Sequence, residues 1–281
     1  MSRRWQQVRH QLRRNRPAQF SLFVLFIFVI AALCAGLSPY DPDQMALGAR
    51  TLPPDAAHWF GTDEYGRDYF TRALYGGQIS LMVGFLAMVF STLIGTVVGT
   101  VSGYFGGWLD NLMMRAVDIL MAIPAFFLLL VVNAYLKPGV DNIILIISLL
   151  TWMSMSRLVR AETLSVKERE YVLYARASGE HPLRIIVRHI IPGVLPTIIV
   201  AATLNIASAI LMESTLSFLG LGVQAPAASW GSMLNNAQSY IGEASWLAMF
   251  PGILILLTVF SFNVLGDVFR TAFEPGANRD E

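Results

Sequence analysis

The sequence is poor in the residue types that disulfide frameworks and catalytic sites use. It has a single cysteine, Cys34, so it cannot form an internal disulfide. Its only lysines are Lys137 and Lys167, and neither follows a glycine-rich phosphate loop, which excludes a Walker-type ATP site. The four histidines are not spaced as metal ligands, and no Gly-x-Ser-x-Gly nucleophile motif is present. We therefore expect no catalytic residue, no metal and no cofactor bound by this chain.

Charge is scarce as well. Charged residues make up only 14% of the chain, hydrophobic residues make up 55%, and the net charge is +1. So small a net charge gives no reason to expect a nucleic-acid partner. The chain is too apolar for an ordinary soluble domain of its length. The composition therefore favours an integral membrane protein.

Six segments approach the length of about 20 apolar residues that a membrane-spanning helix needs, and they predict an all-α membrane protein with six transmembrane helices. The first segment is longer than the hydrophobic core of a signal peptide and no convincing cleavage site follows it, so we interpret it as a retained span. The fourth is short and rich in serine. The six segments are Phe20–Leu37, Ile79–Ser102, Leu112–Leu136, Asn142–Ser156, Ile190–Met212 and Leu247–Gly266.

The distribution of cations predicts the orientation of these spans. With the N-terminus inside, sixteen of the twenty Lys and Arg residues lie in inner segments, Arg115 and Arg279 included. Because inner loops carry the excess of cations, both termini are predicted to be cytoplasmic. The predicted organisation is a basic cytoplasmic tail lying on anionic headgroups (1–17), a first transmembrane helix (18–37), an extracytoplasmic loop (38–77), a five-helix core (78–270) with an inner loop (157–190) and an outer loop (214–246), and a cytoplasmic tail (271–281).

The second span carries one small residue every four positions. In a helix, such a stripe lets another backbone approach closely, so it predicts a packed bundle. The third span contains Pro124, which removes a helix hydrogen bond and predicts a kink. The small residues are Ala87, Ser91, Gly95, Gly99 and Gly103.

Two outer segments have recognisable local patterns. Between Asp63 and Arg72 we expect a short helix, in which Asp63–Arg67 and Asp68–Arg72 form surface ion pairs four residues apart. Between Ser214 and Trp246, apolar residues alternate with Gly, Pro and Ser, which suggests a folded-back, partly embedded loop.

The inner stretch ARASGEHPLRIIVRHIIP predicts a helix–turn–helix elbow. Lys167–Ala177 has the composition of a helix, and Ser178 and Gly179 end it, since Gly suits a left-handed C-cap. Pro182 is suited to the first turn of a second helix. There, apolar Ile185, Ile186 and Ile190 alternate with cationic Arg184 and Arg188, before Pro192 and Pro196 mark entry into the fifth span. A solvated loop is the alternative, but a Gly that ends one helix followed by a Pro that begins the next favours a docking element.

The middles of the six spans carry no Asp, Glu, Lys or Arg. A proton-coupled pump or an intramembrane enzyme would usually bury an ionisable group at that depth. A secondary transporter could still use Na⁺ and backbone carbonyls. The residues alone therefore predict a bundle that forms a path without an energy source of its own.

Several blocks, in order, resemble one known family. The sequence is similar to the inner-membrane permeases of binding-protein-dependent ABC importers, specifically the second (C-type) permease of the dipeptide/oligopeptide/nickel branch. The resemblance covers nearly the whole chain and implies the type I ABC importer permease fold. It is carried by HWFGTDEYGRDYFTR (His58–Arg72), EYVLYARASG to IVRHIIPGVLP (Glu170–Pro196), SFLGLG (Ser217–Gly222), SWGSML (Ser229–Leu234) and FNVLGDVFR (Phe262–Arg270).

The resemblance implies that the inner loop is the coupling segment of these permeases, a short helix that inserts into a groove on a cytoplasmic ATPase. Four residues match its pattern: Ala175, Gly179, Pro192 and Pro196. The chain departs from it at Leu173 and Tyr174, where the family commonly has Glu-Ala. Glu170 is a candidate substitute for that acid. The contact surface would then be more apolar and aromatic, with Arg176, Arg184 and Arg188 as candidate partners for acidic ATPase residues.

The resemblance also implies the partners. They are a homologous permease subunit, two cytoplasmic ATPase subunits that bind ATP and Mg, and a periplasmic or lipid-anchored solute-binding protein, in addition to membrane lipid. The expected location is the bacterial inner membrane. The expected cargo is a di- or oligopeptide or a related small solute, which the sequence does not name. An ATP-independent channel or secondary transporter subunit remains the alternative function.

Two further groups of polar residues are candidate sites. Asp63, Arg67, Asp68 and Arg72 are predicted to form an ion-pair cluster at the outer mouth, either purely structural or bracing a docking site for the binding protein. The candidates for lining the path are Asn205, Ser208 and Glu213. For Glu213, contact with the amino group of a peptide competes with anchoring at the membrane interface, which we prefer.

Overall fold

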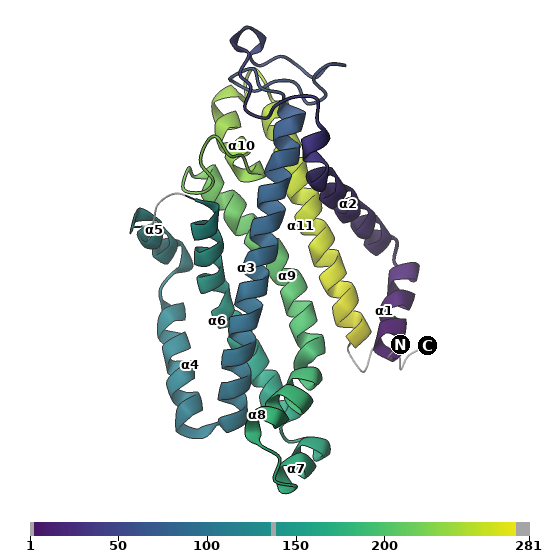
Figure 1. The fold of residues 1–281 in the computed structure, drawn as a ribbon, viewed down its shortest axis with the longest axis vertical. Coiled ribbons are helices and arrows are strands. Elements are labelled where there is room, and N and C mark those ends of the chain that lie inside the picture. The colour runs from purple at the N-terminus through teal and green to yellow at the C-terminus, as the bar shows by residue number, and fades with distance from the viewer. Residues whose placement is uncertain (1–2, 136–138, 274–281) are drawn as a thin grey trace.

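The computed structural model describes residues 3–135 and 139–273, and the secondary structure of these residues is helical without a β-strand (Figure 1). Lys137 and Arg279 of the cation count lie outside the described residues, as does most of the predicted C-terminal tail. The helices are α1 (Arg3–Arg14), α2 (Arg16–Leu33), η1 (Ala35–Leu37), η2 (Leu47–Ala49), α3 (Tyr69–Phe105), α4 (Gly107–Ala122), α5 (Ala125–Tyr135), α6 (Val140–Val166), α7 (Glu170–Ala177), α8 (Pro182–Ile185), η3 (Ile186–Ile190, a π-helix), α9 (Ile191–Phe218), α10 (Trp230–Ala237), η4 (Gln238–Tyr240) and α11 (Trp246–Phe273).

Five helices of the described residues are long and apolar enough to cross a membrane, one fewer than the sequence predicts. They are α2, α3, α6, the continuous α8–η3–α9 unit and α11. The predicted third span, Leu112–Leu136, is divided instead between α4 and α5, with 16 and 11 residues. The division falls at Ile123, whose extended backbone precedes Pro124. A residue before proline is driven out of the helical region, so the predicted kink is a full break.

The elements gather at two ends of the bundle. In Figure 1, α7 and α8 lie at the lower end, near which α1 and the last turn of α11 also lie. The segment before α3 and helix α10 lie at the upper end. We refer to these as the elbow end and the α10 end. The basic helix α1 and the cationic inner loop thus lie at the same end of the bundle. This is the arrangement expected if both face the same side of the membrane.

The stripe of small residues on α3 is buried along its whole length and faces α6 at its lower part. A Cβ atom added to Gly95 would lie 2.6 Å from Cβ of Met155, and one added to Gly99 would lie 2.5 Å from the carbonyl oxygen of Ser156. Both separations are too short for real atoms. The predicted close approach of two helix backbones is therefore confirmed, and it sets the core of the bundle.

Helix α6 extends well beyond the predicted fourth span. It continues ten residues past Ser156 to Val166, because the polar residues there remain helical outside the apolar stretch. Arg160 in this extension makes two hydrogen bonds to Asp110 of α4, each of 2.6 Å. Lys167, just after the helix, donates to the carbonyl oxygen of Gly103 at the end of α3 (3.0 Å). The extension therefore joins α3, α4 and α6 next to the elbow.

The loop between α9 and α11 folds back onto the bundle, as predicted, and contains α10. Ser229 caps this helix with a reciprocal capping box. Trp230 is buried, and its Nε1 donates to the carbonyl oxygen of Ala73 on α3 (2.9 Å). One buried indole thus fixes the loop against the first turns of α3.

Candidate functional site

The elbow begins with α7, which ends as the sequence predicts. Gly179 follows the last turn with a φ of +75°, in the left-handed region that glycine tolerates. The Gly179 N–H donates to the carbonyl oxygen of Arg176 (3.1 Å), and the Glu180 N–H donates to that of Ala175 (3.2 Å). These two bonds are those of a Schellman C-cap. The chain therefore reverses direction at a defined, hydrogen-bonded turn.

The second helix of the elbow begins at Pro182, also as predicted. His181 is its N-cap, and its Nδ1 accepts from the Leu183 N–H (3.3 Å). Pro192 lies in the first turn of α9, at the predicted entry to the fifth span, and a π-turn makes this helix continuous with α8. There, the Ile191 N–H donates to the carbonyl oxygen of Ile186, five residues back. Pro196 lies inside α9. The elbow is thus a rigid extension of the long α9 helix.

The inner surface of the elbow is apolar and buried. Its side chains belong to a cluster with Tyr104 of α3 and with Val159 and Val166 of α6. Burying each such aliphatic side chain is worth roughly 1.5–3 kcal/mol relative to exposure. The elbow is therefore packed against α3, α6 and α9 together. The buried elbow residues are Val172, Ala175, Ile185, Ile186 and Ile190.

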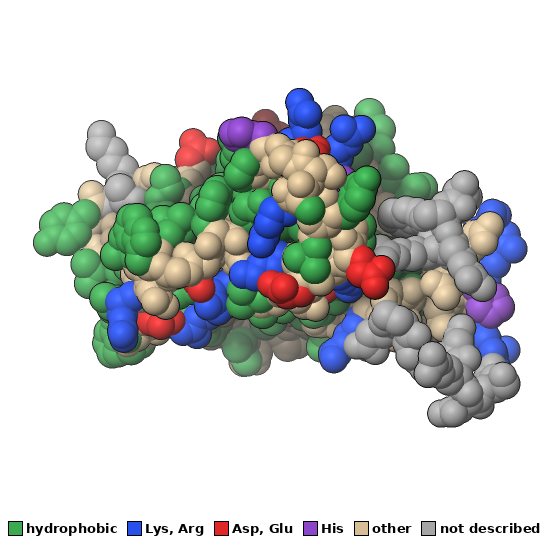
Figure 2. All heavy atoms as spheres, turned by 90° about the horizontal axis from the view of Figure 1, so that it is seen from below, with side chains coloured by type: hydrophobic (Ala, Val, Ile, Leu, Met, Phe, Trp, Pro, Cys, Tyr) green, Lys and Arg blue, Asp and Glu red, His purple; other side chains and the backbone are tan. Residues whose placement is uncertain are grey.

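The outer surface of the elbow is aromatic, apolar and cationic, as the departure from the family pattern predicts. Tyr174 is 75% exposed and Leu173 is 42% exposed, while Leu183 and Val187 of the second helix are exposed beside them. Viewed from below, this end of the molecule combines hydrophobic and cationic side chains (Figure 2). Four polar residues of the elbow that were predicted as contact residues are exposed: Glu170, Arg176, Arg184 and Arg188.

A brace across the turn was missed by sequence reasoning. Nε2 of His189 lies 3.0 Å from Oε2 of Glu180, and Nε of Arg184 lies 4.0 Å from Oε1 of the same carboxylate. Glu180 thus links the turn to two successive turns of the second helix. The spacing of four residues between Glu180 and Arg184 could have indicated their pair, whereas the contact of Glu180 with His189, nine residues later, has no such signal.

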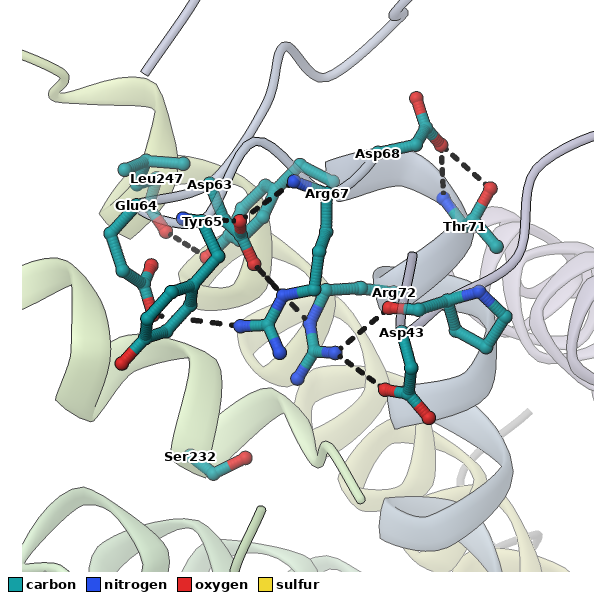
Figure 3. Close-up of polar contacts among 12 residues, drawn as sticks. Asp43, Asp63, Glu64, Tyr65, Arg67, Asp68, Thr71, Arg72, Ser232 and Leu247 are labelled. Carbon is teal, nitrogen blue, oxygen red and sulfur yellow. Dashed lines mark hydrogen bonds and ion pairs between the residues drawn. The ribbon is translucent and has the colours of Figure 1, made fainter. Parts of the chain in front are cut away.

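At the α10 end, Asp63, Glu64, Arg67 and Arg72 form a cluster that we call the arginine cluster (Figure 3). Nε of Arg67 donates to Oδ2 of Asp63 (2.6 Å), and Nε of Arg72 lies 3.6 Å from the same oxygen. The other oxygen of Asp63 accepts from the backbone N–H groups of Tyr65 and Arg67. Both arginines are 4% exposed and Asp63 is 1% exposed. One carboxylate therefore holds two buried guanidinium groups.

The short helix predicted between Asp63 and Arg72 is wrong. Gly66 has a φ of +76° within a turn, and α3 begins only at Tyr69. Asp68 is the N-cap of α3, and its Oδ2 accepts from the Thr71 N–H (2.7 Å). The predicted Asp68–Arg72 pair is therefore absent, since the carboxylate is used by the cap. The Asp63–Arg67 pair is present but buried, not on the surface as predicted.

Two more carboxylates lie in buried surroundings. Burial raises the pKa of Glu64, although Nη2 of Arg67 lies 3.6 Å from its Oε1. Glu213 of α9 has no exposed surface and accepts from Ser217 (2.7 Å) and from Ser80 of α3 (3.1 Å). Glu213 thus ties α3 to α9 inside the subunit.

The path-lining candidates differ in exposure. Asn205 of α9 is partly exposed, Ser208 is exposed, and Glu213 is enclosed. Whether any of the three contacts a solute stays a prediction, and so do the coupling and docking roles of the two sites.

Comparison with protein families gives two matches that together cover most of the chain. Residues 95–279 match the family described as binding-protein-dependent transport system inner membrane component. Residues 3–54 match the N-terminal transmembrane domain of oligopeptide transport permease C. The first match contains the whole elbow and extends beyond the described residues at its end.

Curated relatives are similar over almost the full chain. The dipeptide transport system permease protein DppC of Bacillus subtilis (strain 168) is 42% identical over 96% of this chain and 85% of its own. The glutathione transport system permease protein GsiD of Escherichia coli O6:K15:H31 is 40% identical over 96% of this chain and 90% of its own. A putative peptide permease of Brucella suis biovar 1 is 42% identical over 94% and 88%.

A solved structure supports the fold. The structure described as inward facing conformations of the MetNI methionine ABC transporter matches with a TM-score of 0.59 at 20% identity, covering 71% of this chain and 95% of that chain. The family matches and the curated relatives confirm the resemblance of the sequence blocks. With a family match over more than half of its residues and relatives above 40% identity, the chain belongs to the inner membrane components of binding-protein-dependent transport systems.

Proposed function

We propose that this chain is the permease subunit of an ATP-driven, binding-protein-dependent importer of di- or oligopeptides or related small solutes. It forms half of the translocation path and a homologous permease forms the other half. The names of the relatives, which include dipeptide, peptide and glutathione permeases, support this class of cargo. Cargo selection rests with a periplasmic or lipid-anchored solute-binding protein.

The elbow is the observation that carries the proposal. It exposes Tyr174, Arg184 and Arg188, while the guanidinium of Arg176 lies over the ring of Tyr104 and the buried side packs on α3, α6 and α9. An exposed aromatic flanked by cations is typical of an interface anchor. We assign this surface to contact with a cytoplasmic ATPase, with Leu173 and Tyr174 in the place of the acid usual in the family. ATP and Mg are bound and hydrolysed by two such partner subunits, and this chain is not itself an enzyme.

The proposed membrane topology has six crossings, with both termini and the elbow cytoplasmic. Helices α4 and α5 together make the crossing that neither makes alone. With 16 and 11 residues, they are about 24 and 17 Å long at 1.5 Å per residue, so each is shorter than the roughly 30 Å hydrocarbon core and the crossing needs both. Cysteine labelling from each side of the membrane at Ser178 and at Glu243 tests this topology, and equal labelling from one side would contradict it.

The coupling role is tested by removing the exposed side chains of the elbow. Tyr174→Ala combined with Leu173→Ala should lower co-purification of the ATPase subunits by about tenfold or more, since central aromatic anchors dominate interfaces. ATP-driven uptake into proteoliposomes should fall with it. Ile241→Ala, which removes an exposed hydrophobic side chain at the α10 end, is the matched control. Uptake that continues without ATP would instead favour a channel or a secondary transporter.

A further inference from the structure

A cavity of about 480 Å³ lies beside the arginine cluster. Sites for small molecules usually have volumes of about 300–1,000 Å³. One wall comes from the segment before α3 and the first turn of α3, and the other comes from the end of α9, the loop after it and α10. Its polar side chains include Asp43, Arg67 and Arg72 on the first wall and Ser217, Ser232 and Asn235 on the second.

Both arginines present unused donors to this cavity. Arg67 uses Nε for Asp63 and Nη2 for Glu64, and Arg72 uses Nη1 for the carbonyl oxygen of Pro42 (2.9 Å) and for Asp43 (3.2 Å). Among the described residues, the structure gives no acceptor within hydrogen-bond distance for Nη1 of Arg67 or Nη2 of Arg72. In Figure 3 these two free ends point to the same side, where Ser232 lies.

On the opposite wall, three polar side chains that line the cavity already have hydrogen-bond partners. The Ser217 hydroxyl donates to Glu213 and accepts from the Val223 N–H (3.0 Å). The Ser232 hydroxyl takes part in the α10 capping box. The Asn235 amide donates to the carbonyl oxygen of Phe218 (2.7 Å). The clearest unfilled capacity in the cavity is therefore a set of guanidinium donors.

Arginine can only donate, so the complementary ligand is an acceptor. Two adjacent guanidinium ends favour a planar group with two oxygens and negative charge, which is a carboxylate. The side chain of Asp43 already shows this chemistry at the rim, where it is half exposed.

We propose that the cavity binds the carboxylate of a small solute through Arg67 and Arg72, and that Asp43 is an internal competitor for Arg72. The volume favours a whole small molecule over the tip of an acidic side chain from a docked protein. The proposal rests on the proposed function only for the identity of the solute. If the cargo is a peptide, its C-terminal carboxylate is the group bound.

The test uses the full permease complex in lipid nanodiscs without its binding protein, with the dipeptide alanylalanine as the probe. Alanylalanine should raise the Tm in a concentration-dependent way, whereas its C-terminal amide should not. Asp43→Asn should tighten binding severalfold, because a competing carboxylate is removed. Arg72→Gln should weaken it by about tenfold or more, since hydrogen bonds to charged groups are the strong ones. Glu243→Gln, at an exposed site at the α10 end, should change nothing.

Three outcomes overturn the proposal. They are equal binding of the dipeptide and its amide, an unchanged affinity of Asp43→Asn for alanylalanine, and a rise in Tm that appears only when the binding protein is present. The result for Asp43→Asn is decisive even if Arg72→Gln fails to fold. Asp43 is half exposed, so its replacement by Asn should leave the fold intact. Wild-type uptake of alanylalanine is measured in parallel. Uptake without binding refutes the cavity site alone, while binding without uptake refutes the proposed cargo and leaves the site intact.

Discussion

The elbow and the arginine cluster use arginine in opposite ways. In the elbow, the interior is aliphatic and Arg176, Arg184 and Arg188 are exposed around the buried face. In the arginine cluster, Arg67 and Arg72 are buried and share the carboxylate of Asp63. The hydrophobic effect fixes the shape of the first region, and charge pairing fixes the second.

The difference indicates what each region is able to do. An exposed arginine keeps its hydration and costs little, so it remains available to a partner subunit. A buried arginine must be paired within the protein, because an unpaired buried charge costs several kcal/mol. The elbow therefore presents exposed cations to its surroundings, and the arginine cluster forms a buried, charge-paired framework beside a cavity.

The largest expected effect is at Asp63. Asp63→Ala leaves two buried guanidinium groups without their shared acceptor and should destabilise the protein by about 3–5 kcal/mol. Thermal unfolding of the purified protein measures this loss. Asp63→Asn, which keeps the shape and removes the charge, should be nearly as harmful. Glu243→Ala at an exposed site is the control. A wild-type Tm for Asp63→Asn would show that charge pairing does not hold the cluster.

The next effect is at Gly179. Gly179→Val forces a β-branched residue into the left-handed region, at a cost of roughly 1–2 kcal/mol. No atom lies within 4 Å of the added Cβ, so the strain stays in the turn and the bundle should still assemble. We expect normal membrane insertion but strongly reduced ATP-driven uptake. Gly242→Val, also in open space but without a positive φ, is the matched control. Normal uptake by Gly179→Val would count against docking at the elbow.

A smaller effect is expected from the exposed cations. Reversing Arg184 and Arg188 to Glu should weaken co-purification with the ATPase subunits, by about 0.2–1 kcal/mol for each exposed pair that is lost. The weakening should diminish at high salt, because screening acts on exposed charges. Arg9→Glu, at an exposed position of α1, is the control. An unchanged yield of the complex at low salt would reject the electrostatic part of the contact.

The smallest effect concerns pH. The folded pKa of Glu64 is raised above its ordinary value of 4.5, so the stabilisation linked to this group is present below that value and is lost as pH rises through the folded pKa. Glu64→Gln should therefore leave the Tm at neutral pH unchanged or slightly higher. It should also flatten the decline in Tm just above pH 4.5. A clear loss of Tm at neutral pH would show that the Arg67–Glu64 pair outweighs the burial.

Sequence patterns predicted the features that depend on neighbours along the chain. The stop at Gly179 and the restart at Pro182 follow from backbone preferences of single residues, and both are present. The α3 stripe follows from a period of four. The division at Pro124 was underestimated, because a kink and a complete break have the same signature in the sequence. Pro192 lies in the first turn of α9 as predicted, but the π-turn that joins α8 to α9 has no signature in the sequence.

The sequence by itself determined that this is a membrane protein with a cationic elbow. The length of the apolar segments, the number of cations and the positions of the helix-ending Gly and the helix-starting Pro are all properties of short stretches of chain. The four-residue spacing also predicted the Asp63–Arg67 pair, but only the tertiary structure decided which charges distant in the sequence meet. Asp63 pairs with Arg72 across the start of α3, and Arg160 reaches Asp110 fifty residues away. Asp68, predicted to pair with Arg72, caps α3 instead. Burial selects these partners, because each buried charge must take the nearest opposite charge that the packed helices bring to it.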